Sequence, residues 1–122
     1  MIFGTFDHLH EGHRFLIREA MKRGDVTVIV GRDANVEKIK GRAPRQSEEE
    51  RSLTIQKEFP DVHVVLGNSD DFLEPLRLYK PDLLLLGYDQ QLPPGISERD
   101  LSIPMERAEA FEPERYKSSL MP

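Results

Sequence analysis

Residues 4–13 read Gly-Thr-Phe-Asp-His-Leu-His-Glu-Gly-His, and this stretch says more about fold and function than any other part of the chain. It follows two apolar residues, Ile2 and Phe3, and precedes a segment whose apolar side chains recur with helical spacing. The sequence therefore predicts a strand, a tight loop and a helix N-terminus in immediate succession. Because the first backbone N–H groups of a helix have no intrahelical partner, such a junction favours an anionic ligand.

His10 and His13 are the candidate catalytic residues of this stretch. With a spacing of three at the start of a helix, both imidazoles face the same turn, and imidazole N–H groups can stabilise charge that develops on a phosphoryl group. A surface or capping role is one alternative for the pair. Zinc ligation, with His8 or Asp7 as a further ligand, is another. The position directly after a strand-end Gly-Thr-Phe-Asp favours phosphoryl chemistry.

The composition is that of one globular domain. The chain has 122 residues and a formal net charge of −5, so we expect a single domain over residues 1–122 that is a poor candidate for non-specific binding to nucleic acid or membranes. Cysteine does not occur in the sequence, which excludes disulfides and thiolate catalysis. No apolar run reaches the length of a membrane-spanning helix and no secretory signal pattern opens the chain, so a cytoplasmic protein is expected.

Short apolar runs alternate with helical patterns along the chain, which predicts an α/β fold with a parallel sheet. The expected strands cover residues 2–4, 26–30, 62–66, 82–86 and 107–111. The expected helices cover residues 12–23, Ser47 to about Phe59, Asp70 or Asp71 to about Tyr79, and a short segment from Ser97. Residues 31–46 are expected to form a loop with one helical turn over residues 36–39.

A basic cluster follows the second expected strand in this otherwise acidic chain. Its members are Lys38, Lys40, Arg42 and Arg45. Ligands gather at the carboxyl ends of strands in open parallel sheets, so these side chains are well placed to bind a triphosphate. A solvated basic loop is the alternative.

Two later segments also offer groups for nucleotide binding. Residues 87–90 read Gly-Tyr-Asp-Gln. Here Asp89 and Gln90 can hydrogen-bond a base edge, and Tyr88 can stack on a ring. Residues 115–119, Arg-Tyr-Lys-Ser-Ser, offer two hydroxyls and a cation for phosphate. An ordinary turn and a capping segment are the alternatives. The sequence contains no P-loop, no Gly-x-Ser-x-Gly elbow and no Gly-x-Gly-x-x-Gly fingerprint, so the expected chemistry is positioning and charge stabilisation.

These motifs resemble those of the HxGH nucleotidyltransferases, the cytidylyltransferase-like superfamily. His10-Glu11-Gly12-His13 is the HxGH element itself, and Lys117-Ser118-Ser119 resembles the family's closing phosphate motif. The resemblance extends over nearly the whole chain. It implies a Rossmann-like, three-layer α/β/α fold with a five-stranded parallel sheet. The implied reaction is attack of a phosphorylated acceptor on the α-phosphorus of a nucleoside triphosphate, with release of pyrophosphate and normally with Mg²⁺. A homodimer is also expected.

The resemblance assigns roles by position. His10 and His13 would stabilise the α-phosphate in the transition state, and Lys38 or Lys40 would contact the acceptor phosphate or the triphosphate. The residues implied to bind nucleotide or phosphate are Gly4, Thr5, Phe6, Asp7, Gly12, Gly87, Asp89, Lys117, Ser118 and Ser119. No residue is assigned as a metal ligand. Arg51 matches an arginine of the family's helix, without a definite role.

Within the superfamily, residues 31–41 and 86–90 look most similar to archaeal-type FAD synthases, which adenylylate FMN. ATP and an FMN-like acceptor are therefore favoured. One alternative is a CTP-dependent cytidylyltransferase acting on glycerol 3-phosphate, although those proteins usually carry a tryptophan in the turn at 87–90. A second alternative is a sugar-phosphate adenylyltransferase of the kind that forms ADP-heptose. A third alternative is a nucleotide-binding module without catalysis, because the segments before Gly4 and after Ser119 are short for the family.

Overall fold

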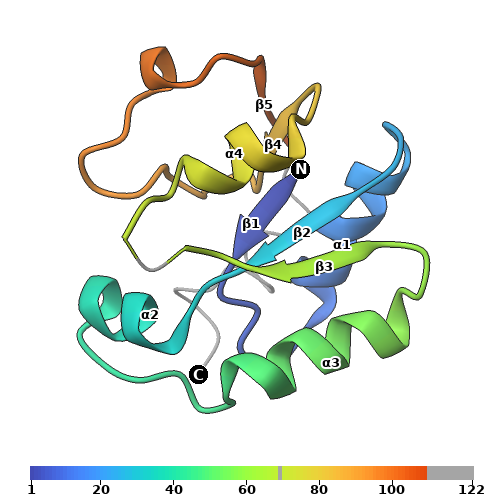
Figure 1. Ribbon diagram of the computed structural model, residues 1–122. Helices are drawn as coiled ribbons and strands as arrows, with labels where there is room; N and C mark the ends of the chain where they lie inside the picture. Colours follow the sequence, from blue (N-terminus) through green and yellow to red (C-terminus); the bar gives the residue numbers. More distant parts are fainter. Residues whose placement is uncertain (69, 110–122) are drawn as a thin grey trace.

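The computed structural model describes residues 1–68 and 70–109, in which parallel strands alternate with helices (Figure 1). In chain order the elements are β1 (Ile2–Gly4), α1 (Glu11–Met21), β2 (Thr27–Val30), α2 (Asp33–Lys40), α3 (Glu48–Glu58), β3 (His63–Leu66), α4 (Glu74–Tyr79), β4 (Leu84–Leu86), a 3₁₀ helix (Glu98–Asp100) and β5 (Met105–Arg107).

The strands form one sheet in the order β1-β2-β3 and a second sheet of β4 and β5, and every pairing is parallel. Two hydrogen bonds join the sheets: the Met1 amino group donates to the Leu83 carbonyl (2.8 Å), and the Leu85 N–H donates to the Met1 carbonyl (3.0 Å). β4 therefore lies beside β1, and the strands follow the Rossmann order 3-2-1-4-5. The expected five-stranded sheet is divided into three and two strands, and the backbone hydrogen bonds that hold β4 beside β1 come from Met1, which precedes β1.

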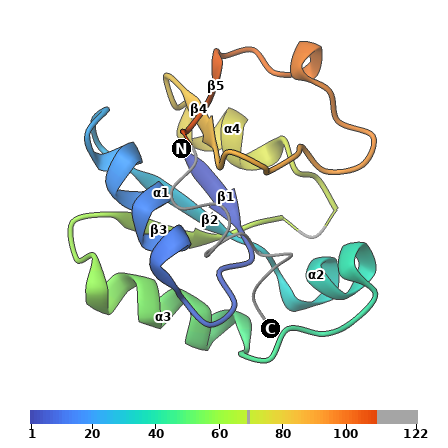
Figure 2. The same cartoon turned by 180° about the vertical axis from the view of Figure 1, so that it is seen from behind.

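Alternate side chains of the strands face two different helix layers. Ile2 and Val28 belong to a buried cluster that includes apolar residues of α1 and α3. Phe3 points the other way and meets the ring of Phe72, just before α4, with 4.8 Å between ring centroids. Figures 1 and 2 show α1 and α3 on one side of the strands and α4 on the other. The predicted three-layer α/β/α architecture is confirmed.

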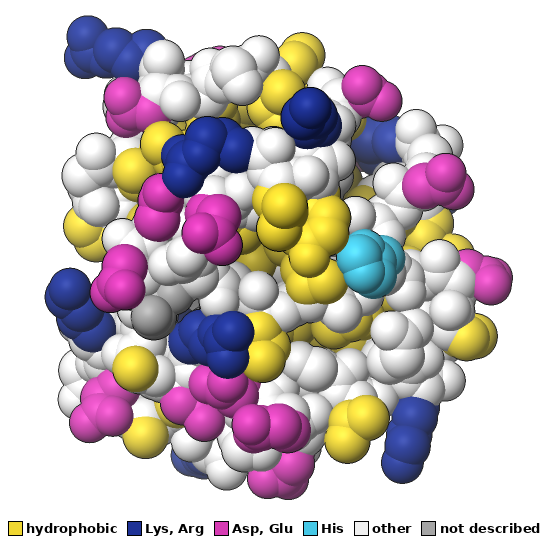
Figure 3. Space-filling view, viewed as in Figure 1, with side chains coloured by type: hydrophobic (Ala, Val, Ile, Leu, Met, Phe, Trp, Pro, Cys, Tyr) yellow, Lys and Arg dark blue, Asp and Glu magenta, His cyan; other side chains and the backbone are white. Residues whose placement is uncertain are grey.

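The face that carries α4 shows charged side chains of both signs around a hydrophobic area near its centre (Figure 3). On α4 itself, Leu78 and Tyr79 are exposed apolar side chains. In the described part of the chain, none of the helices has the length and apolar character needed to cross a membrane.

The predicted loop over residues 31–46 contains a complete helix, α2. Gly41 follows this helix with a φ of 78°, in the left-handed region that favours glycine, and its N–H donates to the Glu37 carbonyl. Gly41 is therefore a helix stop signal. The helix preceding it is correspondingly longer than the single turn expected over residues 36–39.

The helix expected from Asp70 or Asp71 begins later, at Glu74. The Asp71 carboxylate accepts the N–H of Leu73 (3.0 Å), a local bond that turns the chain before the helix can begin. Pro75 lies in the first turn, where it was expected.

The last two predicted elements are present in altered form. β5 is Met105–Arg107 rather than 107–111, and residues 110 and 111 of that prediction lie outside the described residues. Ser97 precedes the 3₁₀ helix, and its N–H donates to the Asp100 carboxylate (2.7 Å).

Candidate active site

His10 and His13 stack on each other at the beginning of α1. Their ring centroids are 3.7 Å apart and their planes differ by 21°. The Gly12 N–H donates to His10 Nδ1 (3.1 Å), and the His10 N–H donates to His13 Nδ1 (3.2 Å). The two imidazoles therefore form a reciprocal capping box, with histidines in the places that Ser or Thr and Glu usually take.

These hydrogen bonds determine which nitrogen of each ring carries the proton. A neutral imidazole has one N–H, and the nitrogen that accepts a hydrogen bond is the unprotonated one. Because Nδ1 is the acceptor in both His10 and His13, Nε2 is the donor in both. The capping role and the catalytic role are therefore compatible: Nδ1 caps the helix, and Nε2 supplies a donor that can stabilise a phosphoryl oxygen.

Both imidazoles are held in the neutral form. Burial lowers the pKa of His13 to about 3, and His10, Lys40 and Arg14 act in the same direction against the opposing effect of Asp7. Burial also lowers the pKa of His10, with a further contribution from Arg14. At neutral pH the pair therefore donates hydrogen bonds without carrying charge.

The loop between β1 and α1 has a strained backbone. Phe6 and His8 have φ values of 54° and 52°, in a region that bulky residues rarely occupy. The buried Phe6 ring stands edge-on to the His13 imidazole, with 5.4 Å between centroids. Strain of this kind collects at functional sites. Here the strained loop places the Phe6 ring in edge-on contact with the imidazole of His13, a candidate catalytic residue.

This packing leaves little room for a side chain at Gly4. A Cβ at position 4 would lie 3.0 Å from the Phe6 ring. We expect Gly4→Ala to destabilise the protein by about 1–3 kcal/mol, because the ring would have to move within a packed interior. Urea unfolding measures this change. The matched control is Gly87→Ala, where the new Cβ comes no closer than 3.7 Å to Gln90; equal losses in the two variants would contradict the packing argument.

Asp7 holds the loop that follows α2. Its carboxylate accepts the N–H groups of Arg45 (2.9 Å) and Gln46 (3.0 Å), and the Gln46 side chain accepts the His8 N–H (3.0 Å). Burial acts to raise the pKa of Asp7, but the two backbone hydrogen bonds and nearby positive charge outweigh it and lower that pKa. In this structure the hydrogen bonds of Asp7 therefore connect the loop over residues 41–46 to the loop between β1 and α1.

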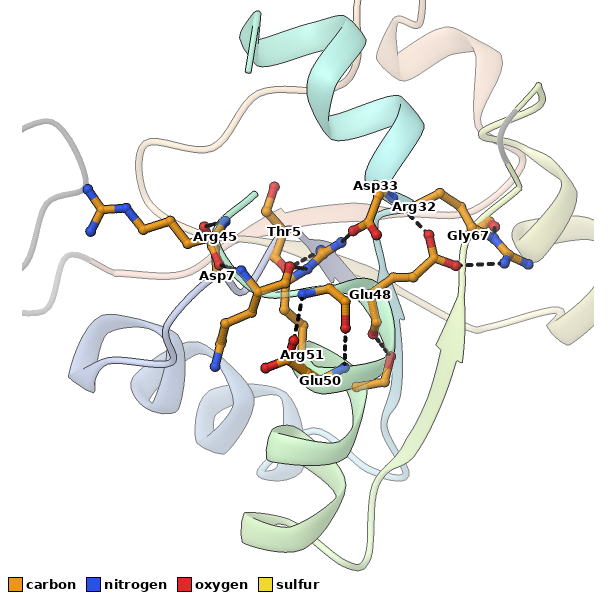
Figure 4. A network of polar contacts seen from close by, with 12 residues as sticks. Thr5, Asp7, Arg32, Asp33, Arg45, Glu48, Glu50, Arg51 and Gly67 are labelled. Carbon is orange, nitrogen blue, oxygen red and sulfur yellow. Dashed lines mark hydrogen bonds and ion pairs between the residues drawn. The ribbon is translucent and has the colours of Figure 1, made fainter. Parts of the chain in front are cut away.

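Arg51 is fully buried, and its guanidinium joins three segments (Figure 4). It donates to the Thr5 carbonyl (2.7 Å), the Gln46 carbonyl (3.1 Å) and the Asp33 carboxylate (2.6 Å). The sequence left its role open. The signal that could have revealed its burial is its position four residues before Ile55, on the same face of α3, since both side chains are 0% exposed.

A second ion pair holds the start of α2 (Figure 4). The Glu48 carboxylate accepts the Asp33 N–H (2.9 Å) and an Arg32 N–H (3.0 Å). Arg32 also donates to the carbonyl of Gly67, just after β3 (2.8 Å). The helix that carries the candidate lysines is therefore fixed to the carboxyl ends of the strands.

Lys38 and Lys40 lie in the last turn of α2 and are exposed. Lys40 is near enough to His13 to lower its pKa. The structure therefore brings the basic helix and the histidine pair to the same end of the sheet. Cations in the last turn also stabilise a helix, so the two lysines have a structural role in addition to any catalytic one.

The turn after β4 is closed by two side chains. Gln90 accepts the Gly87 N–H (3.0 Å) and donates to the Phe3 carbonyl (2.8 Å). Arg107, which the sequence did not single out, donates to three carbonyls of this turn at 2.9, 3.2 and 2.5 Å. Gln90 thus fixes the turn against β1, while Asp89 is exposed.

Of the remaining candidates, Gly12 uses its N–H within the capping box, and Thr5 uses its carbonyl to hold Arg51. Lys117, Ser118 and Ser119 lie outside the described residues, so their predicted contact with phosphate stays a prediction.

The chain belongs to the cytidylyltransferase-like family, whose model matches residues 1–108. It is 38% identical over 117 residues to the FAD synthase of Methanospirillum hungatei JF-1, covering 95% of this chain and 74% of the relative. It is 40% identical over 92 residues to the FAD synthase of Aciduliprofundum boonei, covering 75% of this chain and 61% of the relative. The chain thus spans about three fifths to three quarters of the length of these relatives.

Among solved structures, the chain is similar to the lipopolysaccharide core biosynthesis protein from Thermoplasma volcanium GSS1. The TM-score is 0.79 at 28% identity, covering 92% of this chain and 96% of that chain. The family predicted from the sequence motifs is therefore confirmed.

Proposed function

We propose that this chain is a nucleotidyltransferase that transfers the adenylyl group of ATP to FMN and releases pyrophosphate. Family membership and the two FAD synthase relatives support this proposal. The observation that carries it is the histidine pair. His10 and His13 are stacked and neutral, and both retain Nε2 as the hydrogen-bond donor at the carboxyl end of β1.

In the proposed reaction a phosphate oxygen of FMN forms a bond to the α-phosphorus of ATP, and the bond to pyrophosphate breaks. Negative charge shifts among the phosphoryl oxygens during this step. The Nε2–H groups of His10 and His13 donate to oxygens of the α-phosphate, and Lys38 and Lys40 stabilise the acceptor phosphate or the departing pyrophosphate. The chain supplies orientation and charge stabilisation rather than a nucleophile.

Mg²⁺ is the expected cofactor, and its contribution would be to neutralise charge on the triphosphate. This ion usually keeps several waters and binds through substrate phosphates with one or two carboxylates. Within residues 1–68 and 70–109, no group of three or more His, Cys, Asp or Glu side chains could hold a metal ion. We propose that the ion enters with ATP.

The assembly of the enzyme is also a proposal. Residues 1–122 would form one nucleotidyltransferase domain in a cytoplasmic homodimer, with no nucleic-acid or membrane partner. Sedimentation at working concentration tests the dimer, and a monomer there would exclude it.

The test of function is a substrate matrix. The protein is incubated with Mg²⁺ and either ATP or CTP, together with either FMN or glycerol 3-phosphate, and the products are separated by chromatography. FAD and pyrophosphate are expected from ATP and FMN. A product only from CTP and glycerol 3-phosphate would identify the alternative cytidylyltransferase. Nucleotide binding in calorimetry without any product would instead identify a non-catalytic module.

A further inference from the structure

We propose that Arg51 is a positioning residue: its guanidinium fixes α2, and with it Lys40, relative to the loop that carries His10 and His13. The inference rests on the proposed function and extends it to a buried side chain. Arg51 would act on the reaction through the segments that it holds rather than by touching substrate.

The contacts of Arg51 end on three separate segments. Thr5 lies in the loop between β1 and α1, Asp33 is the first residue of α2, and Gln46 precedes the Ser47 cap of α3. A planar guanidinium directs its donors in a rigid fork, whereas a lysine ammonium is a compact point charge on a flexible stem. Arg51 therefore sets the relative orientation of these segments, which a lysine could not do.

Stability alone does not explain a charge at this position. Arg51 is 0% exposed, and Asp33, its carboxylate partner among residues 1–68 and 70–109, has a side chain that is 42% exposed. Burying the Arg51 charge beside a carboxylate that is partly in water costs desolvation free energy that such a pair does not fully recover. An arginine here is better explained by the geometry it imposes. Glu48 reinforces this geometry, because it accepts the N–H of the same Asp33.

The anchored helix acts electrostatically on the histidine pair. The groups that shift the pKa of His13 are His10 and Arg14 from its own helix, Asp7 from the preceding loop, and Lys40 from α2. Lys40 is the member of this set that lies on α2, the helix that Arg51 anchors through Asp33. Movement of α2 away from the site would weaken the influence of Lys40, and loosening of the loop would expose His13 to water, so either change raises the pKa of His13.

The decisive experiment uses Arg51→Lys, which keeps the charge and removes the fork. The imidazole of His13 is titrated by NMR in the free protein, and kcat and KM are measured for FAD formation. We expect the pKa of His13 to rise and kcat to fall about 10–100-fold, with a smaller change in KM, because misplacement by about 1 Å is enough to slow catalysis to this extent. The matched control is Arg77→Lys on α4, which alters an exposed ion pair with Asp71 of the preceding loop and should leave both quantities unchanged.

Asp33→Asn provides a second variant in case Arg51→Lys does not fold. It keeps Arg51 and weakens one of the three contacts, so both readouts should move in the same direction by smaller amounts. An unchanged His13 titration together with wild-type kcat in the folded variants would overturn the proposal. A wild-type protein that is inactive with every substrate pair would instead contradict the proposed function, whereas the NMR titration would still test the positioning of His13.

Discussion

His10→Asn should fold like the wild type and lose about 10²–10³-fold in kcat, the cost of removing one preorganised hydrogen-bond donor from a charge-stabilising site. The amide oxygen of asparagine can accept the Gly12 N–H in place of His10 Nδ1, and asparagine is among the best N-cap residues. The substitution therefore keeps the cap and removes the Nε2 donor. Steady-state FAD formation, with circular dichroism as the check on folding, measures the effect.

His10→Gln is the matched control for this experiment. The longer side chain carries an N–H donor toward the Nε2 position but caps the helix poorly, so we expect a loss of about 0.5–2 kcal/mol in stability and a smaller loss of kcat than in His10→Asn. The two variants thus separate the structural role of Nδ1 from the catalytic role of Nε2. Wild-type kcat in His10→Asn would show that the imidazole does not act on the phosphoryl group.

The second large effect is a loss of stability in acid that depends on His13. In the unfolded chain this imidazole titrates near its ordinary pKa of 6.5, whereas in the folded protein burial lowers its pKa to about 3. Between these values the unfolded state binds a proton that the folded state does not. The free energy of unfolding should therefore fall as the pH decreases from 6.5 toward 3, by up to about 1.4 kcal/mol per pH unit. The lowered pKa of His10 acts in the same direction.

Urea unfolding at a series of pH values from 7 to 4 tests this expectation. His13→Asn removes the titrating group and should flatten the decline, whereas His63→Asn replaces an exposed histidine and should leave the slope close to that of the wild type. A His13→Asn protein that loses stability with the wild-type slope would assign the acid sensitivity to other groups. Asp7, whose pKa lies below its ordinary value of 3.8, contributes only at the acid end of the range.

The local features of this fold were predictable from sequence. Strand and helix periodicity predicted the order of the elements, and a spacing of three residues predicted that His10 and His13 face the same turn. The full length of α2 was not predicted, because a glycine such as Gly41 is typical of loops as well as of helix ends that follow a basic last turn.

The long-range features were not predictable. Arg51 contacts Thr5 across 46 positions of sequence, and Arg107 contacts Gly87 across 20. Neither arginine carries a local signal of its partners, because these contacts exist only after the strands have paired. The candidate catalytic residues were therefore proposed from the sequence, whereas the residues that hold them in place required the structure.

The imidazoles of His10 and His13 both cap α1 and have a proposed catalytic role, so a protein engineer cannot change the cap of this helix without changing the candidate site. Serine, threonine or aspartate in the first turn is a standard route to a more heat-resistant protein. At positions 10 and 13 such a substitution would satisfy the backbone but remove the Nε2 donors proposed for catalysis, so gains in thermal tolerance should be sought elsewhere. The exposed Leu53 on α3, with 59% of its surface accessible, is a safer place to begin.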